Sequence, residues 1–266
     1  MKFLKKILLF SLVSSLSFLL AACSTLTPNN AMEKIIETNK NIKSVHFNST
    51  TMVETVFNEQ TNIGTVTIDG FTTKEPHTEK INIKNEFHSS TSDHTNEDTN
   101  IYLNNDILYI SKDDSWLKYT GNFSKLKYKN LSNLEASDKI LEIYKKIAND
   151  FQATTEGDTL VLNYKGSGDY FKDLLVEIMN ATTPGEQLDT NTLNNIEFKN
   201  VEIKYIVKKA DFLPISSEIT MNLASKNDTS QSLNIKQKIN YSDINSVQPI
   251  EIPKEVTDNI SQTIDH

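Results

Sequence analysis

Apolar and polar residues alternate over long stretches of this chain, and that period of two is typical of β-strands with one buried face. The first run starts at Ser44, where Val45 and Phe47 share one face of the predicted strand and His46 lies on the other. Further runs of this kind cover 81–88, 201–207, 213–223 and 233–241. Because Lys, Glu, Ser, Thr and Asn fill most of the alternate positions, we expect the second face of each strand to lie in water.

Less regular segments add to the predicted sheet. The stretch 63–71 alternates poorly and contains Gly64 and Gly70. Glycine weakens a strand and often marks a bulge, so we expect a bulged or edge strand here. Shorter predicted strands lie at 101–103, 107–110, 116–119 and 159–165. Together with the longer runs they make about eight to ten strands.

Helices are predicted in three places. Apolar residues recur at helical spacing, although weakly, over 31–43. A capping-box pattern at Ser132–Glu135, in which a hydroxyl and a carboxylate bond the free amides of a first turn, precedes a stronger helical run that ends at Phe151. The third helix follows the turn residues 166–169 and carries an apolar stripe along one side.

These elements predict a single α+β domain over 31–266, in which a curved antiparallel sheet packs its helices on one face. Eight to ten strands spaced about 4.8 Å apart form a sheet roughly 40–50 Å wide, whereas each helix covers about 10 Å. A sheet this wide twists and curves around its helices. Its apolar face is therefore wider than the helices that cover it, which leaves either an ordinary side-chain core or a pocket for an apolar ligand.

The first thirty residues predict a lipid anchor. A cationic start over 1–6 is followed by an apolar stretch over 7–20 and then by Leu20-Ala21-Ala22-Cys23. This order is typical of a secretory signal that ends in a lipobox, where the cysteine thiol accepts diacylglycerol before cleavage. We therefore expect a signal peptide at 1–22, a tether at 23–30 lipidated on Cys23, and a location on the extracytoplasmic face of the cell membrane. The alternatives are an ordinary signal with an incidental cysteine and an anchor that is not cleaved.

The charge of the chain limits its partners. The net charge is −8, and it becomes −11 when the leader with its three lysines is removed. All basic side chains are lysines, and the sequence contains no arginine. Nucleic-acid binding is therefore not expected, because a concentrated basic surface for phosphates is missing. The single cysteine excludes an intramolecular disulfide and a thiolate metal cluster.

Four segments carry a resemblance to a known superfamily. They are Ile42–Phe47, Leu160–Phe171, Lys209–Pro214 and Ile250–Val256. With the order of lipobox, short tether, helix, long strands, two mid-chain helices and three long strands, the sequence resembles the LolA/LppX-like lipoproteins. Within them it is most similar to a branch of surface lipoproteins from Gram-positive bacteria. This resemblance implies an open half-barrel of antiparallel strands that is closed by helices on its concave face and holds lipid or acyl chains.

The predicted function is therefore the binding of a lipid or another hydrophobic ligand in a half-barrel cavity, with no enzymatic activity and no cofactor. The residues expected to line the cavity are apolar, and they come from the buried faces of the strands and from a covering helix. From the strands they are Val45, Phe47, Ile81, Ile83, Phe87, Ile203, Tyr205, Ile219, Met221 and Ile235. From the helix they are Phe171, Leu175 and Ile178. The same residues equally fit a plain hydrophobic core.

A surface interaction module is the alternative function. Such a module docks onto a membrane or cell-wall complex through its acidic outer face and needs no small-molecule ligand. The sequence does not identify a protein partner.

Two other kinds of site have less support in the sequence. His77, His88 and His94 lie with Asp93, Glu97 and Asp98 in a polar stretch, and imidazole with carboxylate suits zinc. On a single strand His77 and His88 would face opposite sides, however, so solvated strand ends and a loop explain the cluster better. For hydrolysis, no serine lies in a Gly-x-Ser-x-Gly elbow, and His46 is on the polar face of its strand. No metal site and no catalytic residue are therefore predicted.

Overall fold

A computed structural model describes the chain over 26–58, 60–89, 95–121, 133–168, 171–176, 194–228 and 230–265. The predicted signal peptide and the lipidation site Cys23 lie outside these residues. Ile178 of the predicted ligand set, and Asp93 and His94 of the histidine-rich stretch, also lie outside them.

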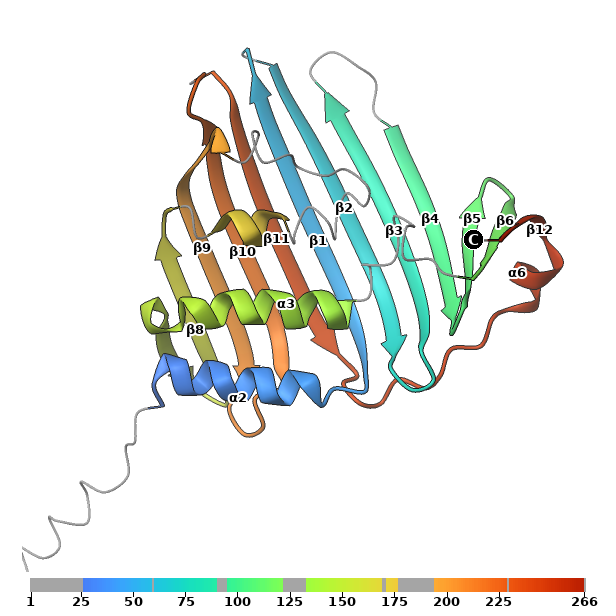
Figure 1. Ribbon diagram of the computed structural model, residues 1–266, viewed down its shortest axis with the longest axis horizontal. Helices are drawn as coiled ribbons and strands as arrows, with labels where there is room; N and C mark the ends of the chain where they lie inside the picture. Colours follow the sequence, from blue (N-terminus) through green and yellow to red (C-terminus); the bar gives the residue numbers. More distant parts are fainter. Residues whose placement is uncertain are drawn as a thin grey trace, which may run out of the picture.

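Twelve strands form one sheet in the described part of the chain (Figure 1). They are β1 (Ser44–Phe57), β2 (Gln60–Thr73), β3 (Thr78–Ser89), β4 (Thr95–Asn104), β5 (Ile107–Lys112), β6 (Ser115–Thr120), β7 (Gln152–Glu156), β8 (Thr159–Gly166), β9 (Ile196–Lys208), β10 (Pro214–Ser225), β11 (Ser232–Ser242) and β12 (Ile260–Asp265). Their spatial order is β12-β6-β5-β4-β3-β2-β1-β11-β10-β9-β8-β7. Neighbouring strands are antiparallel apart from β12, which runs parallel to β6.

The two strands that the sequence pattern did not predict are β7 and β12, and they form the two edges of the sheet. Their sequences are mostly polar, and most of their side chains are exposed or half-buried. An edge strand contributes little to the core, so its residues need not alternate. For this reason the estimate of eight to ten strands was too low.

Helices cover one face of the sheet. They are α2 (Pro28–Lys40), α3 (Asn133–Lys146) and the short 3₁₀-helix η3 (Ala148–Asp150), while α6 (Lys254–Asp258) lies beside β6. Figure 1 shows α2 and α3 side by side, both running across the strands over β8–β11. Residues 171–176 add a short helical segment. We call the face that carries these helices the inner face and the opposite one the outer face.

Local signals determine where α2 begins. Pro28 occupies the first turn, where its missing N–H is not needed, and Thr27 Oγ1 accepts a hydrogen bond from Asn30 N at 3.3 Å. The helix therefore starts three residues before the predicted 31–43 and ends at Lys40. Its buried side chains include Met32, Ile35 and Ile36, which face the sheet as the weak apolar spacing predicted.

The prediction of a bulged or edge strand at 63–71 was wrong. β2 is central, and it pairs with β1 and β3 without a break in register. A glycine is needed at position 70 because the ring of Phe47 occupies the space that a side chain there would take. A Cβ there would lie 2.6 and 2.9 Å from Cε1 and Cε2 of Phe47, the residue paired with Gly70 across the sheet. The glycine lets a large ring lie flat against the strand.

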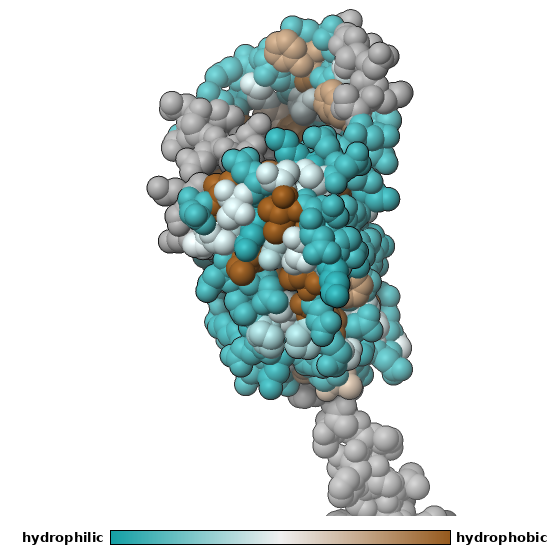
Figure 2. Space-filling view, turned by 90° about the vertical axis from the view of Figure 1, so that its right-hand side faces the viewer, coloured by the Kyte–Doolittle hydropathy of each residue, from teal (hydrophilic) through white to brown (hydrophobic). Residues whose placement is uncertain are grey.

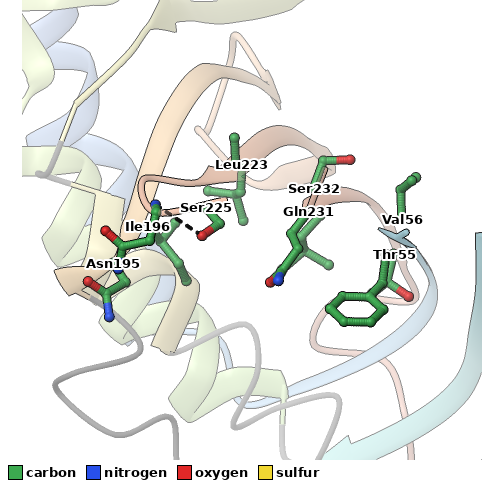
Figure 3. A pocket seen from close by; sticks show the side chains of 12 residues that line it. Thr55, Val56, Asn195, Ile196, Leu223, Ser225, Gln231 and Ser232 are labelled. Atoms are coloured by element: carbon green, nitrogen blue, oxygen red, sulfur yellow. Dashed lines mark hydrogen bonds between the residues drawn. The ribbon is translucent and has the colours of Figure 1, made fainter. Parts of the chain in front are cut away.

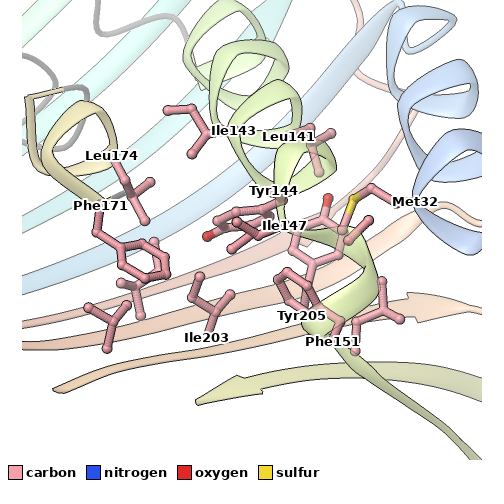
Figure 4. Packing of buried hydrophobic residues seen from close by; sticks show 14 of the residues in the cluster. Met32, Leu141, Ile143, Tyr144, Ile147, Phe151, Phe171, Leu174, Ile203 and Tyr205 are labelled. Carbon is pink, nitrogen blue, oxygen red and sulfur yellow. The ribbon is translucent and has the colours of Figure 1, made fainter. Parts of the chain in front are cut away.

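Buried apolar side chains form two clusters on the inner face. The helix-covered cluster lies under α2, α3 and η3 and includes Met32, Ile35, Tyr144, Phe151, Leu162, Phe171, Tyr205 and Met221 (Figure 4). The strand cluster lies over β1–β5 and comprises Ile42, Val45, Phe47, Ile68, Ile81, Ile83, Ile101, Leu108, Ile110 and Ile239. The described chain is thus an open, curved, mostly antiparallel sheet with few helices, which is richer in strand than the predicted α+β class implied.

Candidate ligand-binding site

A pocket of about 420 Å³ lies at the end of the sheet where β1 and β10 finish and β9 and β11 begin. Figure 3 shows Thr55 and Val56 on one side of it and Asn195 and Ile196 on the other, with Leu223 between them. Much of the lining is apolar and includes Val56, Phe57, Ile196, Leu223, Ala224 and Leu233. Pockets that hold small molecules usually measure about 300–1,000 Å³ and are mostly apolar, so this one is large enough for a ligand.

Beyond this pocket, along β2 and β3, no described helix covers the inner face. Val53, Gly64 and Phe87 stand opposite one another on neighbouring strands. Among the described residues, no atom lies within 4 Å of the position that a Cβ on Gly64 would take. Phe87 is 42% exposed and Phe57 is 50% exposed, although both side chains are large and apolar. We call the pocket together with Val53, Gly64, Val66 and Phe87 the open end.

Strand length explains why this end is open. β1 has 14 residues, which at about 3.3 Å per residue makes a strand roughly 46 Å long. Two helices lying side by side across the strands cover only about 20 Å of that length. Figure 1 shows α2 and α3 near one end of β9–β11, away from the turns that join β1 to β2 and β10 to β11. The described helices therefore leave the other end of the inner face without a cover.

The structure brings most of the predicted ligand residues onto the inner face but buries them. Val45, Phe47, Ile81 and Ile83 belong to the strand cluster. Seven others belong to the helix-covered cluster: Phe171, Leu175, Ile203, Tyr205, Ile219, Met221 and Ile235. Phe87 alone of the described set lies at the open end. Their role in binding stays a prediction, but their packing is that of a core.

The residues that line the pocket were not in the predicted set. Leu223 and Leu233 belong to the alternating runs, but they lie next to the strand ends, where the pattern stops being informative. Ile196 follows a stretch with no clear period. The one available signal was that large apolar residues such as Phe57 continue to the very end of a strand, where a turn normally brings polar ones.

Polar side chains interrupt the inner face in its middle. Ser49 and Thr51 on β1, Ser217 on β10 and Gln237 on β11 occupy inward positions, and all four are buried. Gln237 Nε2 donates a hydrogen bond to Thr51 Oγ1 at 3.1 Å, whereas Gln237 Oε1 has no hydrogen-bond partner among the described residues. We call these four residues the polar seam.

Three tyrosines lie near the polar seam: Tyr144 on α3 and Tyr205 on β9 are buried, and Tyr241 on β11 is partly buried. Burial raises the pKa of Tyr144 well above its usual range, while a contact with the Ser217 side chain, outside normal hydrogen-bond geometry, lowers it. Burial also raises the pKa of Tyr205, and it raises the pKa of Tyr241 to about 12. The hydroxyls of Tyr144 and Tyr205 are buried without a hydrogen bond of normal geometry to any described residue. In Figure 4 the two hydroxyls point in different directions: the Tyr205 hydroxyl points towards Leu141, and the Tyr144 hydroxyl points towards the side where Leu174 lies.

A chain of serine, histidine and aspartate lies on the outer face. His46 Nδ1 is 2.9 Å from Ser242 Oγ and His46 Nε2 is 2.8 Å from Asp69 Oδ1, which matches the order of groups in a catalytic triad. The ring stacks on Phe71 with the centroids 4.1 Å apart. However, these residues lie within regular paired strands, whose N–H groups are engaged in the sheet and cannot bind an oxyanion. The geometry favours a surface hydrogen-bond network over a catalytic site.

The histidine-rich stretch does not form a metal site among the described residues. His77 Nε2 lies 3.0 Å from Glu79 Oε1 at one end of β3, and His88 lies at the other end of the same strand. The part of the chain that the structure describes holds no group of three or more potential metal ligands. Within the same residues, no helix combines the length and the apolar character that a membrane span requires.

Comparison with known proteins gives a family and distant structural likenesses. Residues 27–261 match the model described as "Family of unknown function (DUF6612)". No similar protein was found among curated sequences. Of the solved structures, LprF from Mycobacterium bovis is similar with 11% identity and a TM-score of 0.42, over 86% of this chain and 97% of LprF. Lipovitellin, in a structure of its lipid–protein interactions, is similar with 8% identity and a TM-score of 0.41, over 79% of this chain and 26% of that one. A DUF1329 family protein from Desulfovibrio piger is similar with 9% identity and a TM-score of 0.22, over 82% of this chain and 96% of that protein.

Proposed function

The chain belongs to the DUF6612 family, whose function is unknown. From its geometry we propose that it is a membrane-anchored lipoprotein that binds a lipid or another apolar ligand at the open end. One observation carries this proposal. The same inner face is packed under the helices, whereas beyond them it presents apolar side chains that no described helix covers.

The energetics favour an apolar guest at the open end. Phe57 and Phe87 expose about half of their side chains, and Val53 and Val66 are only partly buried. Covering apolar surface gains about 25 cal/mol for each Å² removed from water. A ligand with an alkyl chain would remove such surface from Phe57 and Phe87 at once, whereas a polar ligand would gain nothing from them.

Two other pockets lined by described residues do not suit such a ligand. A pocket of about 530 Å³ beside β8–β10 is lined by Lys165, Glu202, Lys204 and Glu218 among others. Another of about 540 Å³ lies against the outer sides of the helices, with Lys40, Asp138 and Lys146 in its lining. Charged side chains like these must lose water when an apolar molecule covers them, which is costly.

The predicted leader supports a place at the membrane. Since α2 begins at Pro28, the segment from Cys23 to Thr27 would hold it within roughly 16 Å of the lipidated cysteine, at about 3.3 Å per residue. A folded part this close to the bilayer suits exchange of an apolar ligand with lipid. We propose that it does so at the extracytoplasmic face, in a half-barrel of the LolA/LppX kind, and without catalysis.

Filling the open end tests the proposal. Gly64→Trp places a ring in the space above Gly64, and no positive φ opposes the new side chain. Thr65→Trp is the matched control, because it puts the same ring on the outer face one residue later. In a chain of residues 24–266, which holds the whole described fold, Gly64→Trp should weaken the binding of the apolar fluorophore N-phenyl-1-naphthylamine at least tenfold, and Thr65→Trp should leave it unchanged. If the unmodified chain does not bind the fluorophore, or if both variants bind it equally, the open end is not a binding site.

A second candidate function is the docking of a protein partner. Figure 2 views the end of the sheet where β6, β12 and α6 lie, and apolar side chains interrupt its hydrophilic surface there. Ile260 and Ile264 on β12 are half-buried, and β12 is an edge strand. Edge strands can pair with another chain. Native mass spectrometry of the freshly purified protein separates the two functions, since co-purified lipid supports the first and a stoichiometric protein partner the second.

A further inference from the structure

Three separate sequence segments each break their apolar alternation at an inward position, and the fold brings the breaks together. On β1 the inward residues Ser49 and Thr51 stand between Phe47 and Val53. On β10 and β11 the inward residues Ser217 and Gln237 replace what the pattern predicts to be apolar. Thr51 pairs with Gln237 across β1 and β11, and Ile239 stands between Ser49 and Ser217. The polar seam is therefore a compact patch in an apolar surface.

The polar seam carries hydrogen-bonding capacity that the described fold does not use. Gln237 is 7% exposed, and its Oε1 has no partner among the described residues, although Nε2 bonds Thr51. The hydroxyl of Tyr144, which is fully buried, is also without a partner of normal geometry. Such groups reduce stability unless something bonds them, so a buried amide oxygen and a buried phenol in one place need an explanation.

Both groups are neighbours of Ser217 on the inner face: the Tyr144 ring lies 6.3 Å from the ring of Tyr205, which pairs with Ser217. Tyr144 lies next to Ser217, which stands diagonally from Gln237 across β10 and β11. Diagonal neighbours on one face of a sheet are about 7–8 Å apart. An amide oxygen accepts a hydrogen bond, and a phenol both donates and accepts. A hydroxyl group matches this pair, because it can donate to Gln237 Oε1 and accept from Tyr144.

The surroundings select against a charged group. The residues paired directly with the polar seam across the strands are Val66, Ile68, Tyr205, Ile219 and Ile239, and none of them carries a charge. A carboxylate or a phosphate would be buried there without a counter-ion, which is strongly unfavourable. An uncharged group avoids that cost.

The polar seam also borders the open end. Thr51 and Val53 are successive inward residues on β1, about 7 Å apart along the strand, and Val53 stands opposite Gly64. Val66, the partner of Thr51 on β2, is only partly buried. A molecule whose chain lies over Gly64 can thus place one end at Thr51 and Gln237.

We propose that the polar seam, with Tyr144, binds the uncharged hydroxyl of an apolar ligand whose alkyl chain occupies the open end. This inference rests on the proposed function and makes it specific. The ligand class is a long-chain alcohol or a lipid with a free hydroxyl, such as a partially acylated glycerol, and not a fatty-acid anion. Gln237 and Tyr144 determine the preference, while the apolar residues of the open end supply affinity for the chain.

Three probes of equal chain length test this inference: dodecan-1-ol, dodecane and dodecanoate. Each competes with N-phenyl-1-naphthylamine for the chain of residues 24–266 at pH 8. We expect dodecan-1-ol to bind at least tenfold more tightly than dodecane or dodecanoate. Gln237→Met keeps the size of the side chain and removes the amide, so it should abolish the preference for the alcohol and leave dodecane binding unchanged. Tyr144→Phe should reduce the same preference, and Gln262→Met on the exposed edge strand β12 is the matched control.

The outcomes separate this inference from the proposed function. If no probe displaces the fluorophore from the unmodified chain, the open end binds no apolar ligand and both ideas fail. If dodecane and dodecan-1-ol bind equally well, or if Gln237→Met keeps the preference, the apolar site stands and the hydroxyl site is refuted, as expected when a trapped water satisfies Gln237. Tight binding of dodecanoate would refute the selection against charge. Unfolding curves of both variants, matched to the unmodified chain, show whether a loss of preference comes from a loss of fold.

Discussion

At one end of the inner face the ring of Phe47 fills the space above Gly70, whereas six residues earlier on the same strand Gly64 has no described atom above it. β1, β2 and β3 are continuous, and they pair in one register from end to end. Backbone geometry is therefore not what separates the packed end from the open end. The difference lies in which side chains cover the inner face: Phe47 of the strand cluster fills the space above Gly70, and no described side chain fills the space above Gly64.

The largest contrast is expected between two phenylalanines. Phe47 is 2% exposed and Phe87 is 42% exposed. Phe47→Ala should lower the free energy of unfolding by about 3–5 kcal/mol, because it removes a buried ring and leaves a cavity. Phe87→Ala should lower it by less than about 1 kcal/mol, because this ring is already largely in water. Urea unfolding of both variants measures the difference, and similar losses would mean that Phe87 also belongs to the packed end.

Alanine substitutions at the two glycines of β2 should also change the stability differently at the two ends. Gly70→Ala forces a methyl group into the ring of Phe47 and should cost about 1–3 kcal/mol of stability, the usual range for an overpacked core. Gly64→Ala adds a methyl group in open space and should be neutral or stabilising by up to about 1 kcal/mol, because alanine restricts the unfolded chain. Thermal unfolding of the pair is the measurement. A marked loss for Gly64→Ala would show that the space above it is filled.

A smaller loss of stability is expected at alkaline pH, because three tyrosines of the packed region lose their protons there. Burial raises the pKa of Tyr241 from an ordinary value of 10 to about 12, and it also raises the pKa of Tyr144 and Tyr205. The unfolded chain loses these protons near pH 10 and the folded chain keeps them, so protonation favours the fold. The contribution of these protonated tyrosines to the free energy of unfolding is complete below about pH 10, and it declines as the pH rises towards 12.

Denaturant unfolding at pH 9 and at pH 11.5 measures this decline. Tyr241→Phe should reduce the difference between the two stabilities, because phenylalanine has no proton to lose. A stability that stays constant between these pH values in the unmodified chain would contradict the burial of the three tyrosine hydroxyls.

Much of the sheet could be predicted from the sequence because the period of two is a local property. The runs at Ser44, at 81–88 and at 201–241 all became strands, and the outer face is polar as their alternation required. The pairing of β12 with β6 could not be predicted, because it joins segments about 140 residues apart and neither is strongly amphipathic. The candidate site was predicted only as a class, an apolar face wider than its helices, and the pocket residues at the strand ends were missed.

By itself, the sequence determined which side of each long strand is apolar and which segments form α2 and α3. Its leader is typical of a lipoprotein, and the lipid anchor stays a prediction. Those features depend on neighbours a few residues away. Only the tertiary structure decided that Ser49, Thr51, Ser217 and Gln237 share one patch. It also decided that the ring of Phe47 fills the space above Gly70, while no described atom fills the space above Gly64. The physical reason is that strand register and the placement of helices across a sheet join residues far apart in the chain, and alternation along one strand carries no information about either.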